Sequence, residues 1–436
     1  MNGTRSGQQT IFFLTSFILF FTGNGLYPLL PLFAGGFGAG PATIGVFLAS
    51  LSASNAVGAV AAGWLLARFA PRTLYVAAGA LGVPALLVLA LADAMWLVVL
   101  GTTVAWFVGG FVMTLVSVLT GLTVAPEARG RAFSRLFLAS PLGAILGGGA
   151  LGALVDGLGY APGFVVLAVM WTAIPLLGLR LARVAPAEPG GPAAPPEAAA
   201  PSAKAAPSAK AAPSQVAAPL GGSFYLLLVS ALAVAAALHT RNVAAFLQMQ
   251  EAGFSAAAIG STTVVAGVVT IPVALFGGSL SDRVGRRTLM LATTALAALT
   301  LVFMAGAGEL WQFAAGLALL LAATAVLRPA TTAIATDLLP PAALQRGLPL
   351  IEAGTMGVGI AAAAGAGYAL ERFGVEGVTV VSAALLLLSA LALGLLCSRQ
   401  LVGAVCPAPV QRMAFWPGRT KAAAAVRPAA VTSPRR

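Results

Sequence analysis

The chain has 436 residues, of which 59% are hydrophobic and only 8% are charged, and its formal net charge is +12. Soluble globular domains carry about 25% charged residues, so this composition excludes a soluble enzyme and a secreted domain. A pI near 11.0 would suggest nucleic-acid binding in a soluble chain. In a membrane protein, the Lys and Arg residues that raise the pI report the orientation of the loops instead, and we expect no nucleic-acid partner.

Long apolar stretches divide the chain into two groups of six. A bilayer core about 30 Å thick requires roughly 20 apolar residues in a helix. Stretches of that length lie at 10–34, 42–67, 73–92, 95–124, 132–155 and 160–180, and then at 222–250, 255–281, 288–307, 310–336, 347–370 and 377–397. The sequence therefore predicts an all-α integral membrane protein with twelve transmembrane helices.

Two segments of low complexity fall outside these stretches. Residues 184–221 are rich in Ala and Pro, and residues 398–436 are basic with the same bias. Such segments have little to bury and are predicted to be disordered. The predicted organisation is a six-helix bundle at 1–183, a cytoplasmic linker at 184–221, a second six-helix bundle at 222–397 and a basic tail at 398–436.

The two groups are related by an internal repeat. Identical residues recur at a constant offset of 215 positions, among them Arg72-Thr73-Leu74 with Arg287-Thr288-Leu289, Trp96 with Trp311, Pro126 with Pro341, and Gly159 with Gly374. Alanine-rich helices match by chance, but shared Trp, Pro and Arg at one offset do not arise so easily. Because six spans is an even number, both repeats enter the membrane from the same side.

The basic residues predict the orientation of the chain. Of the 24 Lys and Arg residues, all but Arg241, Arg328 and Arg372 lie in the termini or in the loops after spans 2, 4, 6, 8 and 10. The opposite loops carry the acidic residues Asp93, Asp156, Glu251, Glu309, Glu371 and Glu376. By the positive-inside rule, both termini are predicted to be cytoplasmic.

The loop between spans 8 and 9 contains the most specific motif. It reads Gly278-Ser279-Leu280-Ser281-Asp282-Arg283-Val284-Gly285-Arg286-Arg287 and closely resembles the G-x-L-x-D-R-x-G-R-R loop of the major facilitator superfamily. The equivalent loop of the first half keeps Gly63, Arg68 and Arg72 but has Ala67 in place of the acid. The resemblance implies two six-helix bundles around a central cavity and transport of a solute by alternating access.

This loop is predicted to act as a cytoplasmic gate. A carboxylate at a helix end accepts backbone N–H bonds and pairs with arginines while the cytoplasmic face is closed. The predicted gating residues are Arg68, Arg72, Gly278, Asp282, Arg283, Gly285, Arg286 and Arg287. The alternative is that these arginines only determine topology.

Span 5 contains a glycine pattern formed by Gly143, Gly147, Gly148 and Gly152. It resembles the G-P-x-x-G-G motif of drug:proton antiporters, with Ala144 in place of the proline. Small residues allow helix backbones to approach closely, so tight packing is expected in any case. The resemblance implies efflux.

Acids and bases well inside the bilayer are confined to the second six spans. They are His239, Arg241, Arg328 and Glu352. Glu352 lies about 9 Å and Arg328 about 14 Å from the cytoplasmic ends of their helices, at 1.5 Å per residue, which predicts a salt bridge. That pair either neutralises itself or couples transport to protons, with His239 as a second candidate for proton coupling.

The repeat also predicts a cavity. It aligns His239 with Asn24 and Asn242 with Tyr27, and spans 1 and 7 line the central cavity in the family that the loop resembles. The predicted substrate cavity therefore comprises Asn24, Tyr27, His239, Asn242 and Arg328.

The sequence favours a multi-pass, monomeric protein of the bacterial cytoplasmic membrane that exports a small organic solute in exchange for protons or another cation. Arg241 and Arg328 favour the alternative, uptake of a small polar or anionic metabolite. A sensor or assembly scaffold that transports nothing is an alternative of another class. One histidine and two cysteines, with no phosphate-binding loop, argue against a metal site, a cofactor and enzymatic activity.

Overall fold

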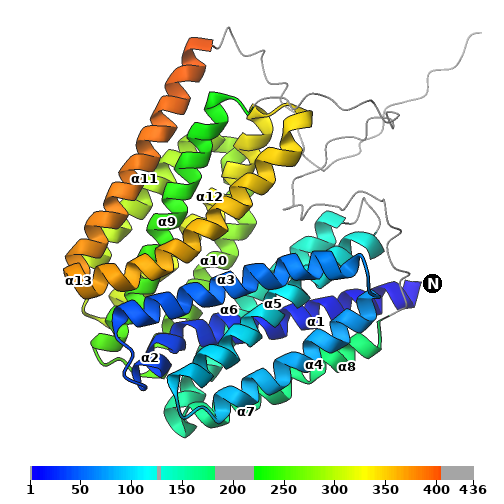
Figure 1. Ribbon diagram of the computed structural model, residues 1–436. Helices are drawn as coiled ribbons and strands as arrows, with labels where there is room; N and C mark the ends of the chain where they lie inside the picture. Colours follow the sequence, from blue (N-terminus) through cyan, green and yellow to red (C-terminus); the bar gives the residue numbers. More distant parts are fainter. Residues whose placement is uncertain (1, 125–128, 182–219, 404–436) are drawn as a thin grey trace, which may run out of the picture.

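The computed structural model describes residues 2–124, 129–181 and 220–403, which form helices joined by short connections (Figure 1). The first half contains α1 (Asn2–Leu26), the 3-10 helix η1 (Tyr27–Leu29), α2 (Leu30–Gly35), α3 (Pro41–Leu66), α4 (Pro71–Ala90), α5 (Met95–Thr123), α6 (Arg129–Leu158), α7 (Tyr160–Trp171) and α8 (Ala173–Leu179). The second half contains α9 (Gly222–Glu251), α10 (Ala256–Val284), α11 (Arg286–Ala305), α12 (Leu310–Leu338) and α13 (Pro341–Gly403).

Eleven candidate membrane spans occur within the described residues, and the last of them is a double one. It covers Arg346–Leu396, 51 residues, and bends sharply at Gly374. Each of the two arms exceeds the roughly 20 residues that a bilayer requires, so the described chain has the length for twelve crossings. The predicted linker lies almost wholly outside the described residues. The predicted tail does so from residue 404 onward, because α13 continues to Gly403.

Sharp reversals of the chain use glycines in the left-handed region. Gly159 separates α6 from α7 with a φ of 85°, and Gly374 divides α13 with a φ of 66°. Gly38 and Gly253 have φ values of 78° and 74° in the connections that precede α3 and α10. A side chain disfavours this conformation, which explains the residue type. The members of each pair lie 215 positions apart, which is the offset of the sequence repeat.

The helices of each half gather into a separate group, and the two groups cross at two places (Figure 1). At one crossing α3 packs on α13, and at the other α6 packs on α10. Both crossings depend on glycine. A Cβ on Gly45 would lie 2.9 Å from the Cα of Gly367, and one on Gly260 would lie 2.2 Å from the carbonyl oxygen of Gly148. Only residues without side chains permit such close backbone approach.

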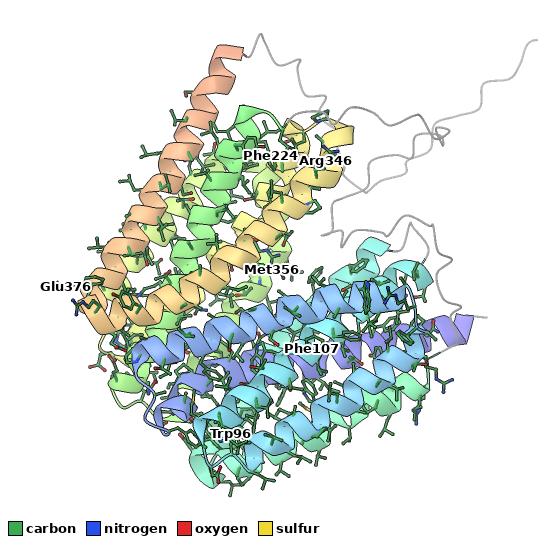
Figure 2. The ribbon with its side chains drawn as sticks, in the orientation of Figure 1. Trp96, Phe107, Phe224, Arg346, Met356 and Glu376 are labelled. Atoms are coloured by element: carbon green, nitrogen blue, oxygen red, sulfur yellow. The ribbon has the colours of Figure 1, made fainter. Side chains whose placement is uncertain are left out.

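The two ends of the molecule differ. We call the end at which α3, α6, α10 and α13 approach one another the closed end; it carries Ala42, Asp156, Ala256 and Glu371. The halves diverge toward the opposite, splayed end, where Figure 2 shows Phe224 and Arg346.

Candidate functional site

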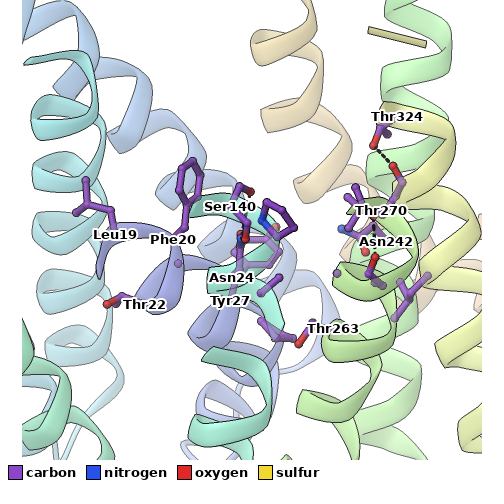
Figure 3. Close-up of a pocket in the computed structure, with 18 of the residues that line it drawn as sticks. Leu19, Phe20, Thr22, Asn24, Tyr27, Ser140, Asn242, Thr263, Thr270 and Thr324 are labelled. Atoms are coloured by element: carbon purple, nitrogen blue, oxygen red, sulfur yellow. Dashed lines mark hydrogen bonds between the residues drawn. The ribbon is translucent and has the colours of Figure 1, made fainter. Parts of the chain in front are cut away.

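A cavity of about 630 Å³ lies between the two halves. Its lining includes all five residues that the sequence predicted for a substrate cavity: Asn24, Tyr27, His239, Asn242 and Arg328. Figure 3 shows Asn24 and Tyr27 on the first-half side of the cavity and Asn242 on the second-half side. The cavity therefore combines α1 and η1 with α9 and α12.

The two walls differ in chemistry. The first-half wall is rich in aromatic and sulfur-containing side chains, among them Phe20, Tyr27, Trp106, Met113 and Trp171. The second-half wall is rich in threonine hydroxyls, from Thr262, Thr263, Thr270 and Thr324, and also carries the amide of Asn242. Arg328 is the one charged residue among the described residues that line the cavity.

Sequence analysis missed most of this lining. Asn55, Trp106 and Ser140 belong to spans in which it singled out no cavity residue, and the threonines of α10 and α12 were also overlooked. An amide in an apolar span, such as Asn55, is a usable signal, because a buried amide requires hydrogen-bond partners. Asn55 donates its side-chain N–H to the carbonyl oxygen of Trp106 at 3.3 Å.

Neighbouring helices hold the first-half polar groups in place. The Asn24 side chain donates a hydrogen bond from Nδ2 to the carbonyl oxygen of Ser140 on α6, at 3.0 Å. Tyr27 begins η1, and its ring meets the ring of Phe246 edge-on with centroids 6.4 Å apart. Since Phe246 belongs to α9, this aromatic pair joins the two halves beside the cavity.

The ring of His239 is held by a hydrogen bond to the backbone of its own helix. Its Nδ1 lies 2.9 Å from the carbonyl oxygen of Ala235. A carbonyl only accepts, so Nδ1 carries the hydrogen and Nε2 of the neutral ring is left as an acceptor. The ring lies against α13, where a Cβ on Gly359 would be 3.3 Å from Nε2. In this tautomer Nε2 can accept a hydrogen bond from a donor.

The ion pair predicted between α12 and α13 is present. Arg328 Nη2 donates to Glu352 Oε2 at 2.8 Å. The side chains of Arg328 and Glu352 are 71% and 37% exposed, respectively, so the pair is not buried. Arg328 lines the cavity itself, whereas Glu352 stands behind it on the first arm of α13. The pair thus links a cavity residue on α12 to a carboxylate on α13.

Arg241 does not face the cavity, and the expectation that it favours an anionic substrate is wrong. Its side chain is fully buried and donates to the carbonyl oxygen of Met304, near the end of α11, and to Oε1 of Gln248 at 3.1 Å. A cation at a helix C-terminus is favoured by the helix dipole. Arg241 is therefore a structural residue that caps α11.

The arginines of the first-half loop form contacts within their own bundle. The guanidinium of Arg68 lies 3.8 Å from the centre of the Trp64 ring, and Arg72 donates to the carbonyl oxygen of Leu179 at 2.6 Å. In the second-half loop, Gly285 has a φ of 91° and turns the chain from α10 into α11. The side chains of Asp282, Arg283, Arg286 and Arg287 lie outside the described part of the structure, so a gate at this loop stays a prediction.

The glycines of span 5 pack helices together on two sides of α6. A Cβ on Gly143 or Gly147 would meet the backbone of Phe20 or Phe21 on α1, at 2.6 Å and 2.3 Å respectively. A Cβ on Gly148 or Gly152 would meet α10, and the nearest atom to Gly152 would be the carbonyl oxygen of Ala256 at 2.7 Å. Close packing therefore accounts for all four positions.

We expect Gly147→Val to destabilise the first half by about 1–3 kcal/mol, because the carbonyl oxygen of Phe21 cannot move without separating α1 from α6. The measurement is thermal unfolding of the purified protein in detergent. Gly149→Val is the matched control: it lies on the same helix, and its Cβ would meet only the Val264 side chain at 3.4 Å. Equal melting temperatures for the two variants would contradict the packing role.

Together, the apolar helices, the two groups of spans and the cavity between them define a multi-span membrane protein with the architecture of a solute transporter. The chain belongs to the Major Facilitator Superfamily, whose family model matches residues 12–248 and 221–409. No curated protein sequence matches the chain.

Solved structures show the same fold. A bacterial homologue of the human lysosomal transporter Spinster, in an inward-facing and unoccupied conformation, has a TM-score of 0.69 at 13% identity, with 94% of this chain and 100% of that chain covered. A mutant of the peptide transporter POT in complex with alafosfalin has a TM-score of 0.67 at 15% identity, with 90% and 94% covered. The POT family transporter PepTSo has a TM-score of 0.65 at 12% identity, with 91% and 98% covered. At these identities the likeness concerns the fold alone.

Proposed function

We propose that the chain is a proton-coupled secondary transporter that carries a small amphipathic organic solute by alternating access. The observation that carries this proposal is the cavity of about 630 Å³ between two halves that approach each other at one end. Rocking of the halves about such a cavity exposes a bound solute to one side of the membrane and then to the other.

The splayed end is assigned to the cytoplasm. Apart from Arg372, the Lys and Arg residues outside the spans belong to the termini and to the loops assigned to this end, and acidic residues such as Asp93, Asp156 and Glu371 lie in or next to the opposite loops. The conformation described above is then open to the inside. On this orientation both termini lie inside, which fits the proposed location in the cytoplasmic membrane of a bacterium.

The chemistry of the cavity supports a substrate with an apolar aromatic body and a neutral or anionic head. Trp106 and Met113 offer the body a surface, and the second-half hydroxyls offer the head hydrogen bonds. Arg328 favours a negative head and repels a cation. A cationic drug would find no carboxylate among the described residues that line the cavity.

The ion pair supports co-transport with a proton. Protonation of Glu352 removes the negative charge that holds Arg328, and the freed guanidinium then binds an anion more tightly. By linkage, the anion raises proton affinity by the same factor. A proton and an anion that favour each other's binding move together, which gives uptake under an inward proton gradient. Efflux, which the span-5 glycines favoured, is the alternative.

Flux into liposomes that contain the purified protein tests this function. Three probes share a naphthalene body and differ in the charge of the head, which stays constant over the pH range of the experiment. They are naphthalenesulfonate (anionic), naphthalenesulfonamide (neutral) and naphthylmethyl-trimethylammonium (cationic). We expect the sulfonate to accumulate on the side opposite an acidic compartment, and the quaternary amine not to move. Accumulation of the sulfonate on the acidic side would establish exchange and therefore efflux. No flux of any probe, with a stable complex to another membrane protein, would favour a scaffold.

A further inference from the structure

Two carboxylates at the closed end each join one half of the protein to the other. Asp156, near the end of α6, accepts the backbone N–H of Ala256 through Oδ1 at 2.9 Å and that of Ala257 through Oδ2 at 3.0 Å. Glu371, next to the bend of α13, accepts the backbone N–H of Ala42 through Oε2 at 2.9 Å. In each case the carboxylate belongs to one half and the donor to the first turn of a helix in the other half.

The two contacts occupy equivalent positions of the internal repeat. Asp156 and Glu371 lie 215 positions apart, and so do Ala42 and Ala257. The glycine contacts at the two helix crossings show the same offset of 215 positions, because Gly45 approaches Gly367 and Gly260 approaches Gly152. The closed end is therefore held by two copies of one arrangement, in which the roles of the halves are exchanged.

The two carboxylates differ in the number of backbone N–H groups that they accept, and this difference has a simple cause. Pro41 occupies the position equivalent to Ala256, and a proline has no N–H. Glu371 consequently accepts one backbone bond where Asp156 accepts two. Ser255 accepts the next N–H of α10, that of Ala258, at 3.2 Å, so the first turn of α10 is fully satisfied by Asp156 and Ser255.

Carboxylates at these positions are favoured by charge as well as by hydrogen bonding. The first turn of a helix presents unpaired N–H groups and the positive end of the helix dipole. Because each carboxylate reaches its helix across the boundary between the halves, these contacts break when the halves separate at this end.

We propose that Asp156 and Glu371 are a pair of latches that keep the closed end shut while the splayed end is open. This inference extends the alternating access of the proposed function, and it assigns a role to two residues outside the cavity. The latches stabilise the conformation described here and must release before the cavity opens through the closed end.

Removing the latches tests this inference. We expect Asp156→Ala and Glu371→Ala each to raise the population that is open at the closed end about 2- to 30-fold, the range for losing an N-terminal helix cap, and the double variant to raise it further. Glu376→Gln is the matched control, because it removes an exposed carboxylate on the other side of the same bend of α13. Ala256→Pro tests the donor side: it deletes one N–H in a first turn that accommodates proline, as Pro41 shows.

Distances between spin labels report the populations directly. Labels on Asp93→Cys and Gly308→Cys, which are 215 positions apart, mark the closed end, and labels on Phe69→Cys and Val284→Cys, also 215 positions apart, mark the splayed end. Both pairs are placed in a chain in which serine replaces Cys397 and Cys406. The expected result is a longer distance at the closed end together with a shorter one at the splayed end.

Unchanged distance distributions in both alanine variants, or an equal shift in Glu376→Gln, would overturn the latches. So would a loss of thermal stability without any change in distance, since that is the result for helix caps with a purely structural role. The readout needs no substrate. Failure of the latches is therefore distinguishable from failure of the transport function, which the flux measurement decides.

Discussion

Glu352→Gln is expected to abolish the dependence of transport on the proton gradient while leaving movement of the solute down its own gradient intact. Glutamine preserves the shape of the side chain and can still accept a hydrogen bond from Arg328, but it does not titrate. The variant resembles the protonated carboxylate, so the affinity for an anion should be high and independent of pH. We expect wild-type binding of naphthalenesulfonate to tighten on acidification by about 5- to 150-fold, the usual range for coupling between two sites.

The measurement is binding of naphthalenesulfonate at acidic and neutral pH, followed by quenching of Trp106 fluorescence in the cavity. Loss of the quenching in Trp106→Phe would show that the fluorescence signal comes from Trp106. His239→Gln separates the two candidates for proton coupling, because His239 lines the cavity and is the other residue that the sequence predicted for this role. Retained pH dependence in Glu352→Gln and its loss in His239→Gln would assign the coupling to His239.

Exchange of the two charges provides a further check on the pair. Arg328→Glu combined with Glu352→Arg restores an ion pair but places the negative charge in the cavity. If Arg328 recognises an anionic head, the double variant should remain folded and lose binding of naphthalenesulfonate. Recovery of binding would show that the pair serves the structure and that substrate recognition lies elsewhere.

Sequence reasoning succeeded where the position of a residue in the fold follows from counting residues along the chain. Depth along a helix follows from the number of residues, and this predicted the contact between Arg328 and Glu352. The fixed offset of the repeat aligned Asn24 with His239, and both line the cavity. Apolar length likewise predicted the spans. The short loop expected between the last two spans is instead helical except at Gly374, because one glycine in the left-handed region suffices to reverse the chain.

Sequence reasoning failed where the partner of a side chain depends on the rotation of a helix or on which residue lies next to it. Arg241 lies two positions from His239, about 200° around the helix, so a different face was expected, but its partner at the end of α11 was not predicted. The sequence of α9 alone does not reveal that Met304 offers a carbonyl at that depth. Asp156 and Glu371 are conspicuous as acids, but their partners are backbone N–H groups, which leave no trace in the identity of a residue. Such contacts emerge only once the helices are packed.

Gly45→Val is expected to force the closed end apart. A Cβ at this position would lie 2.8 Å from the carbonyl oxygen of Ala363 and 2.9 Å from the Cα of Gly367, and both are backbone atoms of α13. Relief of the overlap requires α3 and α13 to separate, which is the movement that opens the cavity at the closed end. Overpacking typically costs about 1–3 kcal/mol, and this penalty falls on the closed arrangement and not on the open one. The equilibrium should shift toward the open one by about 5- to 150-fold.

Reaction of Asn242→Cys with a maleimide that cannot cross the membrane measures this shift, because Asn242 lines the cavity. In intact cells the reagent reaches the cavity only through the closed end, on the orientation proposed above, so Gly45→Val should react faster than the parent. Gly63→Val is the control on the same helix, where an added Cβ would meet no atom within 4 Å. Gly260→Val should repeat the effect at the second crossing, where the Gly148 backbone lies 2.2 Å from the added carbon. The contrary outcome is that Gly45→Val and Gly260→Val both lose thermal stability but react no faster than Gly63→Val. In that case the glycine crossings hold the halves together permanently, and the cavity does not open through the closed end.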